Sequence, residues 1–260
     1  MSGYVINQKF RAVPAPTAER PPSQRQHRLA EMFGLGLDET HEVTLYDGLG
    51  LDVWPGDLVF ITGPSGSGKS VLLRALVRAV RDAQPDGGHV VDLARLHLST
   101  DRPAVDLPDG PLETALRRLS AAGLADAMAL LRPASQLSDG QRYRLRLALA
   151  LDRLLGRPEA GILVADEFCS TLDRCCARAV AYRVRRLVDQ ARTGPDAGGL
   201  TVLAASAHDD LVQDLAPDVL VVKHEGAGVE VRYAEAARDK PLTGGQAASG
   251  TRTPAEEGTP

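Results

Sequence analysis

A glycine-rich run with one lysine is the part of the sequence best suited to chemistry. It follows the apolar run Leu58 to Thr62, precedes a helical pattern, and consists of Gly63, Pro64, Ser65, Gly66, Ser67, Gly68, Lys69 and Ser70. This is the pattern G-x-x-x-x-G-K-[ST] in its strand, loop and helix context. Glycines let the backbone wrap a phosphate, and a helix amino terminus adds partial positive charge. The run predicts an ATP phosphate loop, with Lys69 reaching the β and γ phosphates and the Ser70 hydroxyl binding Mg²⁺.

Two adjacent carboxylates end a second apolar run. Asp166 and Glu167 follow Ile162 to Ala165, which is typical of a buried strand. Asp166 at the end of that strand would hold Mg²⁺ through water, and Glu167 would polarise an attacking water. An apolar run that ends in two acids is common, but its place behind a phosphate loop makes it a strong signal.

The segment Leu137 to Gln141, which reads LSDGQ, closely resembles the ABC ATPase signature LSGGQ. Ser138 and Gln141 have the spacing of a capping box, so the segment should open a helix and present free N–H groups. In the ABC ATPase family this segment covers the γ-phosphate bound by a second subunit. The resemblance therefore implies a head-to-tail homodimer in which Ser138, Gly140 and Gln141 contact nucleotide. Asp139 replaces a glycine, and its carboxylate should point away from the phosphate or weaken closure.

Two further segments occur in the order found in this family. Ser170 to Asp173 resembles the D-loop, which implies that Asp173 contacts the nucleotide site across the dimer. His208, which follows the apolar run Thr201 to Ala205, resembles the switch histidine that contacts the γ-phosphate. The resemblance thus implies Glu167, His208 and Lys69 as catalytic residues, with ATP and Mg²⁺ as ligands.

The sequence departs from the family pattern in two places. Residues 90–133 contain no glutamine, although the family normally carries one at the junction with its helical subdomain; the candidates to replace it are Ser99, Asp101, Asp106 and Asp109. The family also has an aromatic residue that stacks on adenine, for which the sequence offers Thr40, His41, Tyr46 or Trp54. Tyrosine in a strand and tryptophan before a turn are more often packing residues.

Several runs resemble a group of soluble ABC-type ATPases, some fused to a GNAT-like acetyltransferase domain. These runs are Glu31 to Leu37, Leu137 to Leu147, Asp166 to Arg174 and His208 to Lys223. The resemblance implies a stand-alone ATPase with an unidentified protein partner. The alternatives are the ATP-binding subunit of a membrane transporter, docked on a permease, and a nucleotide-gated module with little turnover. A coiled-coil DNA-repair ATPase would need long heptads, which the sequence lacks.

The elements that must position these residues alternate between strand and helix. Apolar β-rich runs cover Val43 to Tyr46, Leu58 to Thr62, Val90 to Leu93, Ile162 to Ala165, Thr201 to Ala205 and Val219 to Val222. Helical patterns cover Ser70 to Asp82, Leu112 to Ala122, Asp126 to Leu131, Gln141 to Leu155 and Asp173 to Arg192. This order predicts an α/β fold with a mostly parallel sheet flanked by helices.

The domain expected from these patterns covers residues 31–235, with a short helical subdomain at about 103–156. The resemblance adds the P-loop NTPase fold of ABC ATPases, including an antiparallel β portion. Residues 1–30 and 236–260 are rich in proline, glycine and polar residues, so both are expected to be disordered.

Composition narrows the functional classes. The 260 residues carry 30 basic and 34 acidic side chains, and a net charge of -4 gives no sign of a nucleic-acid partner. Cys169, Cys175 and Cys176 lack metal-ligand spacing, which favours reduced thiols in a cytoplasmic protein. No apolar run approaches the roughly 20 residues that a membrane-spanning helix needs, so any membrane role should come through a separate chain.

Overall fold

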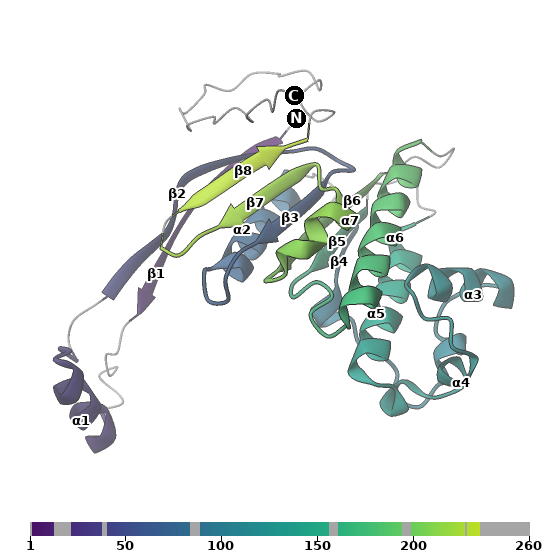
Figure 1. Cartoon of the computed structure of the whole chain (residues 1–260), viewed down its shortest axis with the longest axis horizontal. Coiled ribbons are helices and arrows are strands. Elements are labelled where there is room, and N and C mark those ends of the chain that lie inside the picture. The colour runs from purple at the N-terminus through teal and green to yellow at the C-terminus, as the bar shows by residue number, and fades with distance from the viewer. Residues whose placement is uncertain are drawn as a thin grey trace, which may run out of the picture.

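A six-stranded sheet in the order β4-β5-β6-β3-β7-β8 forms the centre of the fold (Figure 1). The structure is a computed structural model that describes residues 2–12, 22–37, 41–83, 89–155, 161–193, 199–226 and 228–234. The strands are β3 (Leu58–Thr62), β4 (His89–Asp92), β5 (Gly161–Ala165), β6 (Leu200–Ser206), β7 (Val219–Lys223) and β8 (Val229–Tyr233). All neighbours are parallel except β7 and β8, which pair antiparallel. The predicted α/β class with a mostly parallel sheet is confirmed.

One face of the sheet packs against helix α2 (Lys69–Asp82) and strands β1 (Ser2–Ala12) and β2 (His41–Val53). Every second side chain of a strand points to this face, because successive side chains point to opposite faces of a sheet. Val59 and Ile61 of β3 lie here, packed with Leu72 and Leu76 of α2. This core fixes the phosphate loop, which joins β3 to α2.

The opposite face carries the remaining large helices. Leu58 and Phe60 of β3 lie in the same buried cluster as α5 (Asp139–Leu154) and α6 (Arg174–Thr193). The helices α3 (Leu112–Ala121), α4 (Ala127–Leu130) and α7 (Val212–Leu215) add to this side, with short 3₁₀ turns at Leu93–Arg95, Ala104–Asp106, Ala134–Gln136 and Asp209–Leu211. The described residues between β4 and β5 form no strand beyond an isolated bridge from Pro103 to Pro133.

The amino-terminal region differs from its expected disorder. Strand β1 pairs antiparallel with β2 from Ser2 opposite Val53 to Ala12 opposite His41. Side chains alternate between the two faces of β1, so Ile6 is 4% exposed while the neighbouring Val5 is 72% exposed. Burial of Ile6 in the core stabilises the strand on β2. The prediction of a disordered arm over residues 1–30 is therefore wrong for Ser2–Ala12, while residues 13–21 lie outside the described residues.

A short helix, α1 (Gln24–Phe33), follows within the region expected to be disordered. Ser23 and Gln26 form a capping box, and Gly34 ends the helix in the left-handed conformation. Figure 1 shows β1 and β2 projecting beyond the six-stranded sheet, with α1 past their far end. The prediction of disorder is also wrong for Gln24 to Ala30, because local capping defines this helix.

The expected disordered tail at 236–260 lies outside the described residues. None of the helices in the described part of the chain is both long and apolar enough to cross a membrane.

Candidate functional site

The predicted phosphate loop joins the end of β3 to the start of α2. Its glycines adopt positive φ angles, 144° at Gly63, 78° at Gly66 and 101° at Gly68. At Gly63 a Cβ atom would lie 2.0 Å from the carbonyl oxygen of Lys223. Glycine is required there both by the backbone conformation and by the close approach of β7.

Lys69 and Ser67 point toward this loop rather than toward open solvent. Lys69 is 9% exposed, and its Nζ donates to the carbonyl oxygens of Gly63 at 2.8 Å and Pro64 at 2.6 Å. The Oγ of Ser67 is buried and has no hydrogen-bond partner among the described residues. A buried hydroxyl without a partner is costly, so the residues of the loop fit a bound phosphate that would accept these hydrogen bonds. Ser65 and Gly66, in the middle of the loop, are exposed.

Ser70 and Asp166 meet although 96 positions separate them. The hydroxyl of Ser70 donates to Oδ1 of Asp166 at 3.0 Å. Strand order explains the contact, because β3 and β5 both flank β6 and all three end at the same edge of the sheet. One hydroxyl and one carboxylate placed together beside a phosphate loop are ligand types suited to Mg²⁺.

Glu167 follows Asp166 in an unusual backbone conformation. Its φ is 55°, its side chain is exposed, and its N–H donates to Oδ1 of Asp166 at 3.1 Å. Residues held in the left-handed region cost free energy and cluster at functional sites. The carboxylate thus stands at the sheet edge, where it can accept a proton from water.

His208 lies just beyond β6, the strand between β3 and β5. It is half-buried, and its backbone N–H donates to Oγ of Ser206 at 3.2 Å. The topology therefore brings His208 to the same edge as the phosphate loop and the two carboxylates.

The signature segment forms the predicted capping box at the start of α5. Oγ of Ser138 accepts from the N–H of Gln141 at 3.2 Å, and the Gln141 side chain accepts from the N–H of Ser138 at 3.0 Å. A Cβ at Gly140 would lie 3.3 Å from the carbonyl oxygen of Thr171. The signature and the D-loop segment are thus packed together within one chain.

Asp139 turns toward its own helix. Its carboxylate pairs with Arg142 three residues later, and the side chain is 80% exposed. Arg142 also donates to the carbonyl oxygen of Leu137 at 2.5 Å. The pair partly neutralises the carboxylate, which removes part of the repulsion expected for an acid in this segment.

Asp173 caps helix α6 in this structure. Its carboxylate accepts from the N–H of Cys176 at 2.9 Å, and the hydrogen bonds from Cys176 lower the pKa of Asp173. No contact of Asp173 with the phosphate loop is described within this chain, and its predicted role across a dimer stays a prediction.

Sequence reasoning missed a contact between α5 and the loop after Glu167. The N–H of Cys169 donates to the hydroxyl of Tyr143 at 3.0 Å, and Cys169 has a φ of 58°. Burial raises the pKa of the Cys169 thiol to about 12, so this thiol stays protonated at neutral pH. Among the described residues no cluster of histidine, cysteine and carboxylate side chains could hold a metal ion.

The candidates for the missing glutamine lie in an irregular segment after β4. Asp101 accepts from the hydroxyl of Thr100 at 3.0 Å, while Asp106 and Asp109 line a cavity of about 410 Å³. Within the described residues, no hydrogen bond ties these three or Ser99 to Ser70 or Asp166.

Of the candidates for stacking on adenine, Tyr46 is 1% exposed and buried in the core beside the phosphate loop. Trp54 is half-buried, and the side chains of Thr40 and His41 lie outside the described residues. The Tyr46 ring is therefore packed in the core.

Comparisons with known proteins agree with this geometry. A family model described as ABC transporter matches residues 46–106. The chain is 32% identical over 219 residues to the cytochrome c biogenesis ATP-binding export protein CcmA 2 of Cupriavidus metallidurans, covering 71% of this chain and 93% of that protein. It is 35% identical over 170 residues to the aliphatic sulfonates import ATP-binding protein SsuB of Delftia acidovorans, covering 58% of this chain.

The match with SsuB spans 65% of that protein, and a match with the zinc import ATP-binding protein ZnuC of Roseobacter denitrificans spans 53% of that one. The chain thus covers less than two thirds of these relatives' own length. Among solved structures, the dimeric bacterial ABC transporter cassette MJ0796 superposes with a TM-score of 0.53 at 19% identity, over 73% of this chain and 91% of that chain. This likeness shows a shared fold.

Proposed function

Because the chain belongs to the family of ABC transporter ATP-binding proteins, we propose that it binds Mg·ATP and hydrolyses it to ADP and phosphate. The observation that carries the proposal is the hydrogen bond from Ser70 to Asp166, which joins the phosphate loop to the carboxylate pair. Ser70 and Asp166 would hold Mg²⁺ there, and the ion would supply positive charge to stabilise the transferring phosphoryl group.

We assign each residue of the site a role that its placement supports. Lys69 donates to phosphate oxygens in place of the loop carbonyls that it now contacts. Ser70 and Asp166 are the residues that would hold Mg²⁺. Glu167 would accept a proton from the attacking water, since its carboxylate is exposed at the same sheet edge. His208, at the same sheet edge, donates to the γ-phosphate.

The working form that we propose is a head-to-tail homodimer. Ser138 and Asp139 are exposed, and α5 opens with the free N–H groups of its first turn. In a two-fold arrangement these groups and Gln141 would cover the γ-phosphate held by the second subunit. Support comes from MJ0796, an ABC cassette of the same fold that was solved as a dimer.

Two kinds of partner fit the proposed ATPase. A stand-alone ATPase, as in the soluble group sometimes fused to a GNAT-like domain, fits the missing glutamine at the junction. A transporter subunit at the cytoplasmic face of a permease fits the relatives, which are named import and export ATP-binding proteins. It also fits the exposed apolar side chains Leu112 and Leu116 of α3, Met128 of α4, and Leu131 directly after α4.

The substitution Glu167→Gln tests the proposed reaction. We expect ATP hydrolysis to fall roughly 10²- to 10⁴-fold, because the general base is lost while the shape is kept. ATP binding should persist, and light scattering should show an ATP-dependent dimer. The matched control is Glu225→Gln, which changes an exposed acid of the β7–β8 turn and should hydrolyse ATP like the parent.

Hydrolysis by Glu167→Gln at the parental rate would remove Glu167 from the mechanism. A parent that binds Mg·ATP but hardly turns it over would instead support the nucleotide-gated module. Capture of partners from membrane and soluble fractions on Glu167→Gln with ATP distinguishes a permease from a soluble partner.

A further inference from the structure

Tyr46 contacts the phosphate loop through its hydroxyl. It lies on β2, 22 positions before Gly68, and its Oη donates to the carbonyl oxygen of Gly68 at 3.0 Å. The hydroxyl oxygen would also lie 3.5 Å from a Cβ atom at Gly68. The ring is packed in the core with Leu51, Ile61 and Leu72, so it cannot rotate away without opening that core.

The Gly68 carbonyl sits where α2 begins. It also accepts the helical N–H groups of Val71 at 3.0 Å and Leu72 at 3.1 Å. In a planar trans peptide, the N–H of Lys69 points opposite to the C=O of Gly68. Holding the carbonyl toward the core therefore aims the Lys69 N–H, a free donor of the first helical turn, into the phosphate loop.

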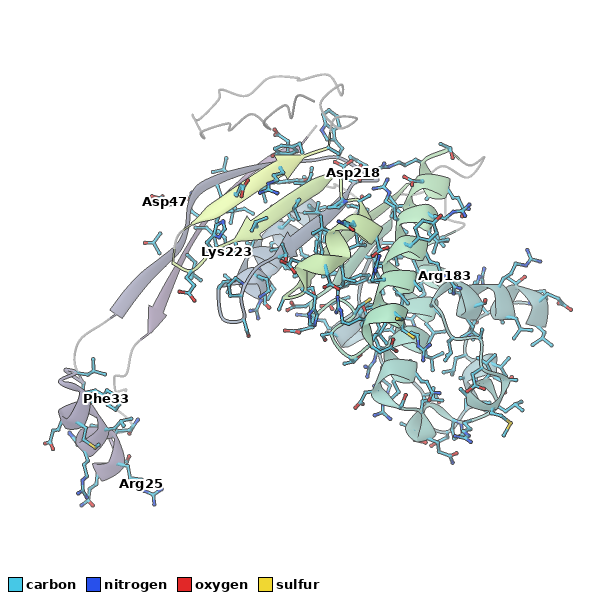
Figure 2. The ribbon with its side chains drawn as sticks, in the orientation of Figure 1. Arg25, Phe33, Asp47, Arg183, Asp218 and Lys223 are labelled. Carbon is cyan, nitrogen blue, oxygen red and sulfur yellow. The ribbon has the colours of Figure 1, made fainter. Side chains whose placement is uncertain are left out.

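Lys223, labelled in Figure 2, lies on β7 and contacts the Tyr46 ring. Its side chain is fully buried, and its Nζ lies 5.3 Å from the centroid of the Tyr46 ring, within cation–π range. The ammonium donates to carbonyl oxygens of the β7–β8 turn, those of His224 at 2.8 Å, Gly226, and Gly228 at 3.4 Å.

The same two residues thus contact both ends of the phosphate loop. The carbonyl of Lys223 meets the backbone of Gly63 at its start, and the hydroxyl of Tyr46 meets Gly68 at its end. A cation close to the ring also makes a phenol a better donor, which strengthens the bond to Gly68.

We propose that Tyr46, supported by Lys223, is a positioning residue that fixes the Gly68–Lys69 peptide and aims its N–H at bound phosphate. The inference rests on the proposed binding of Mg·ATP at this loop. It gives Tyr46 a role through the phosphates, in place of the stacking on adenine considered from sequence.

The substitution Tyr46→Phe removes one hydroxyl and keeps the ring. We expect the Kd of Mg·ATP and of Mg·ADP to rise roughly three- to tenfold, the effect of one lost hydrogen bond. The KM for ATP should rise by the same factor with kcat within about twofold, because the N–H contacts phosphate in both the ground state and the transition state. Calorimetric titration and steady-state hydrolysis measure these quantities.

Tyr233→Phe is the matched control. Its hydroxyl accepts from the N–H of Asp52, also on β2, at 3.1 Å. This variant should lose a similar amount of thermal stability while both nucleotide Kd values stay unchanged. Lys223→Met should weaken Mg·ATP binding in the same direction as Tyr46→Phe, by a smaller factor.

If Tyr46→Phe lowers the Tm as Tyr233→Phe does and leaves the nucleotide Kd unchanged, the hydroxyl is a core contact and the proposal is overturned. If Tyr46→Phe weakens binding but Lys223→Met does not, the supporting role of Lys223 is overturned. Lys69→Ala separates these results from the proposed function, because undiminished Mg·ATP binding by that variant would mean that the loop is not the nucleotide site.

Discussion

Gly63 is the position of the phosphate loop at which a side chain has least room. A Cβ atom there would lie 2.0 Å from the carbonyl oxygen of Lys223 and 3.0 Å from its carbonyl carbon. Cβ atoms do not approach other atoms more closely than 3.0 Å, so the loop and β7 would have to separate by about 1 Å. Lys223 cannot yield easily, because it pairs with Val229 in the sheet and its side chain is fully buried.

The substitution Gly63→Ala should therefore destabilise the protein by two additive effects. Overpacking costs about 1–3 kcal/mol, and a side chain at the φ of 144° adds about 1–3 kcal/mol. For a chain of this size each kcal/mol lowers the Tm by about 2–4 °C, so we expect a loss of roughly 10 °C. Binding of Mg·ATP should weaken as well, because the start of the loop is displaced from β7.

Gly66→Ala is the matched control within the same loop. Gly66 also has a positive φ, of 78°, but a Cβ atom there would have no described atom within 4 Å. Only the conformational cost of about 1–2 kcal/mol remains, equivalent to roughly 4 °C. Thermal unfolding followed by circular dichroism measures both. A Gly63→Ala protein with the Tm and the nucleotide affinity of Gly66→Ala would refute the close approach of β7.

Two further predictions concern other contacts. Tyr143→Phe should lower kcat several-fold with the Kd of Mg·ATP unchanged, because the N–H of Cys169, in the loop after Glu167, loses the hydroxyl that accepts its hydrogen bond. A kcat equal to that of the parent in a steady-state assay would contradict this. Asp218 accepts from Arg185 at 3.0 Å and from Arg192, and although its burial alone would raise the pKa, these contacts lower it overall. Ionised Asp218 therefore stabilises the folded protein at pH values above 3.8, the pKa of this carboxyl in the unfolded chain. This stabilisation is lost as the pH falls through the lower pKa that the carboxyl has in the folded protein. Asp218→Asn should cost about 3 kcal/mol at pH 7, and urea titrations should show that cost shrinking toward pH 2.

The parallel strands could be predicted within one or two residues. Leu58–Thr62 is buried on both faces, so it forms a continuous apolar run bounded by Asp57 and Gly63. The helices that follow such runs have clear apolar periodicity, as α2 does with Leu72, Leu73 and Leu76 buried. Burial on one side or on both leaves a local pattern, and a local pattern can be seen in sequence.

The strands at the margin could not be predicted in the same way. β8 (Val229–Tyr233) is only partly buried along its length and alternates apolar and charged residues over five positions. β1 lies beside a proline-rich stretch, and its order depends on pairing with residues of β2 that lie 29 to 51 positions later. Its stability comes from non-local pairing, which a short window of sequence does not contain.

The residues of the candidate site also fall into two groups, those that a local pattern predicts and those that only non-local packing identifies. Motifs whose spacing is set by one strand, one loop and one helix predict Lys69, Ser70 and Asp166 as site residues. The bonds from Tyr46 to Gly68 and from Cys169 to Tyr143 join elements 22 and 26 positions apart. Neither residue type is unusual in its own segment, so only the packed structure identifies these contacts.

These non-local contacts bear on how two sites of the proposed dimer would communicate. In each chain the amino-terminal part of α5 touches the loop after Glu167 twice, through Gly140 against Thr171 and through Tyr143 to Cys169. In the proposed head-to-tail arrangement, that part of α5 would contact the nucleotide of the second subunit, while Glu167 would act on the nucleotide bound by its own chain. Loss of γ-phosphate at one site would then release α5 of the second subunit. The contacts of Gly140 and Tyr143 with the loop after Glu167 would carry that movement to Glu167 of the same second subunit. Energetic coupling needs an element with two arrangements that both sites bias. We expect this element to be the short loop from Glu167 to Asp173. Two of its residues are in the left-handed conformation, and such a strained backbone is suited to that role.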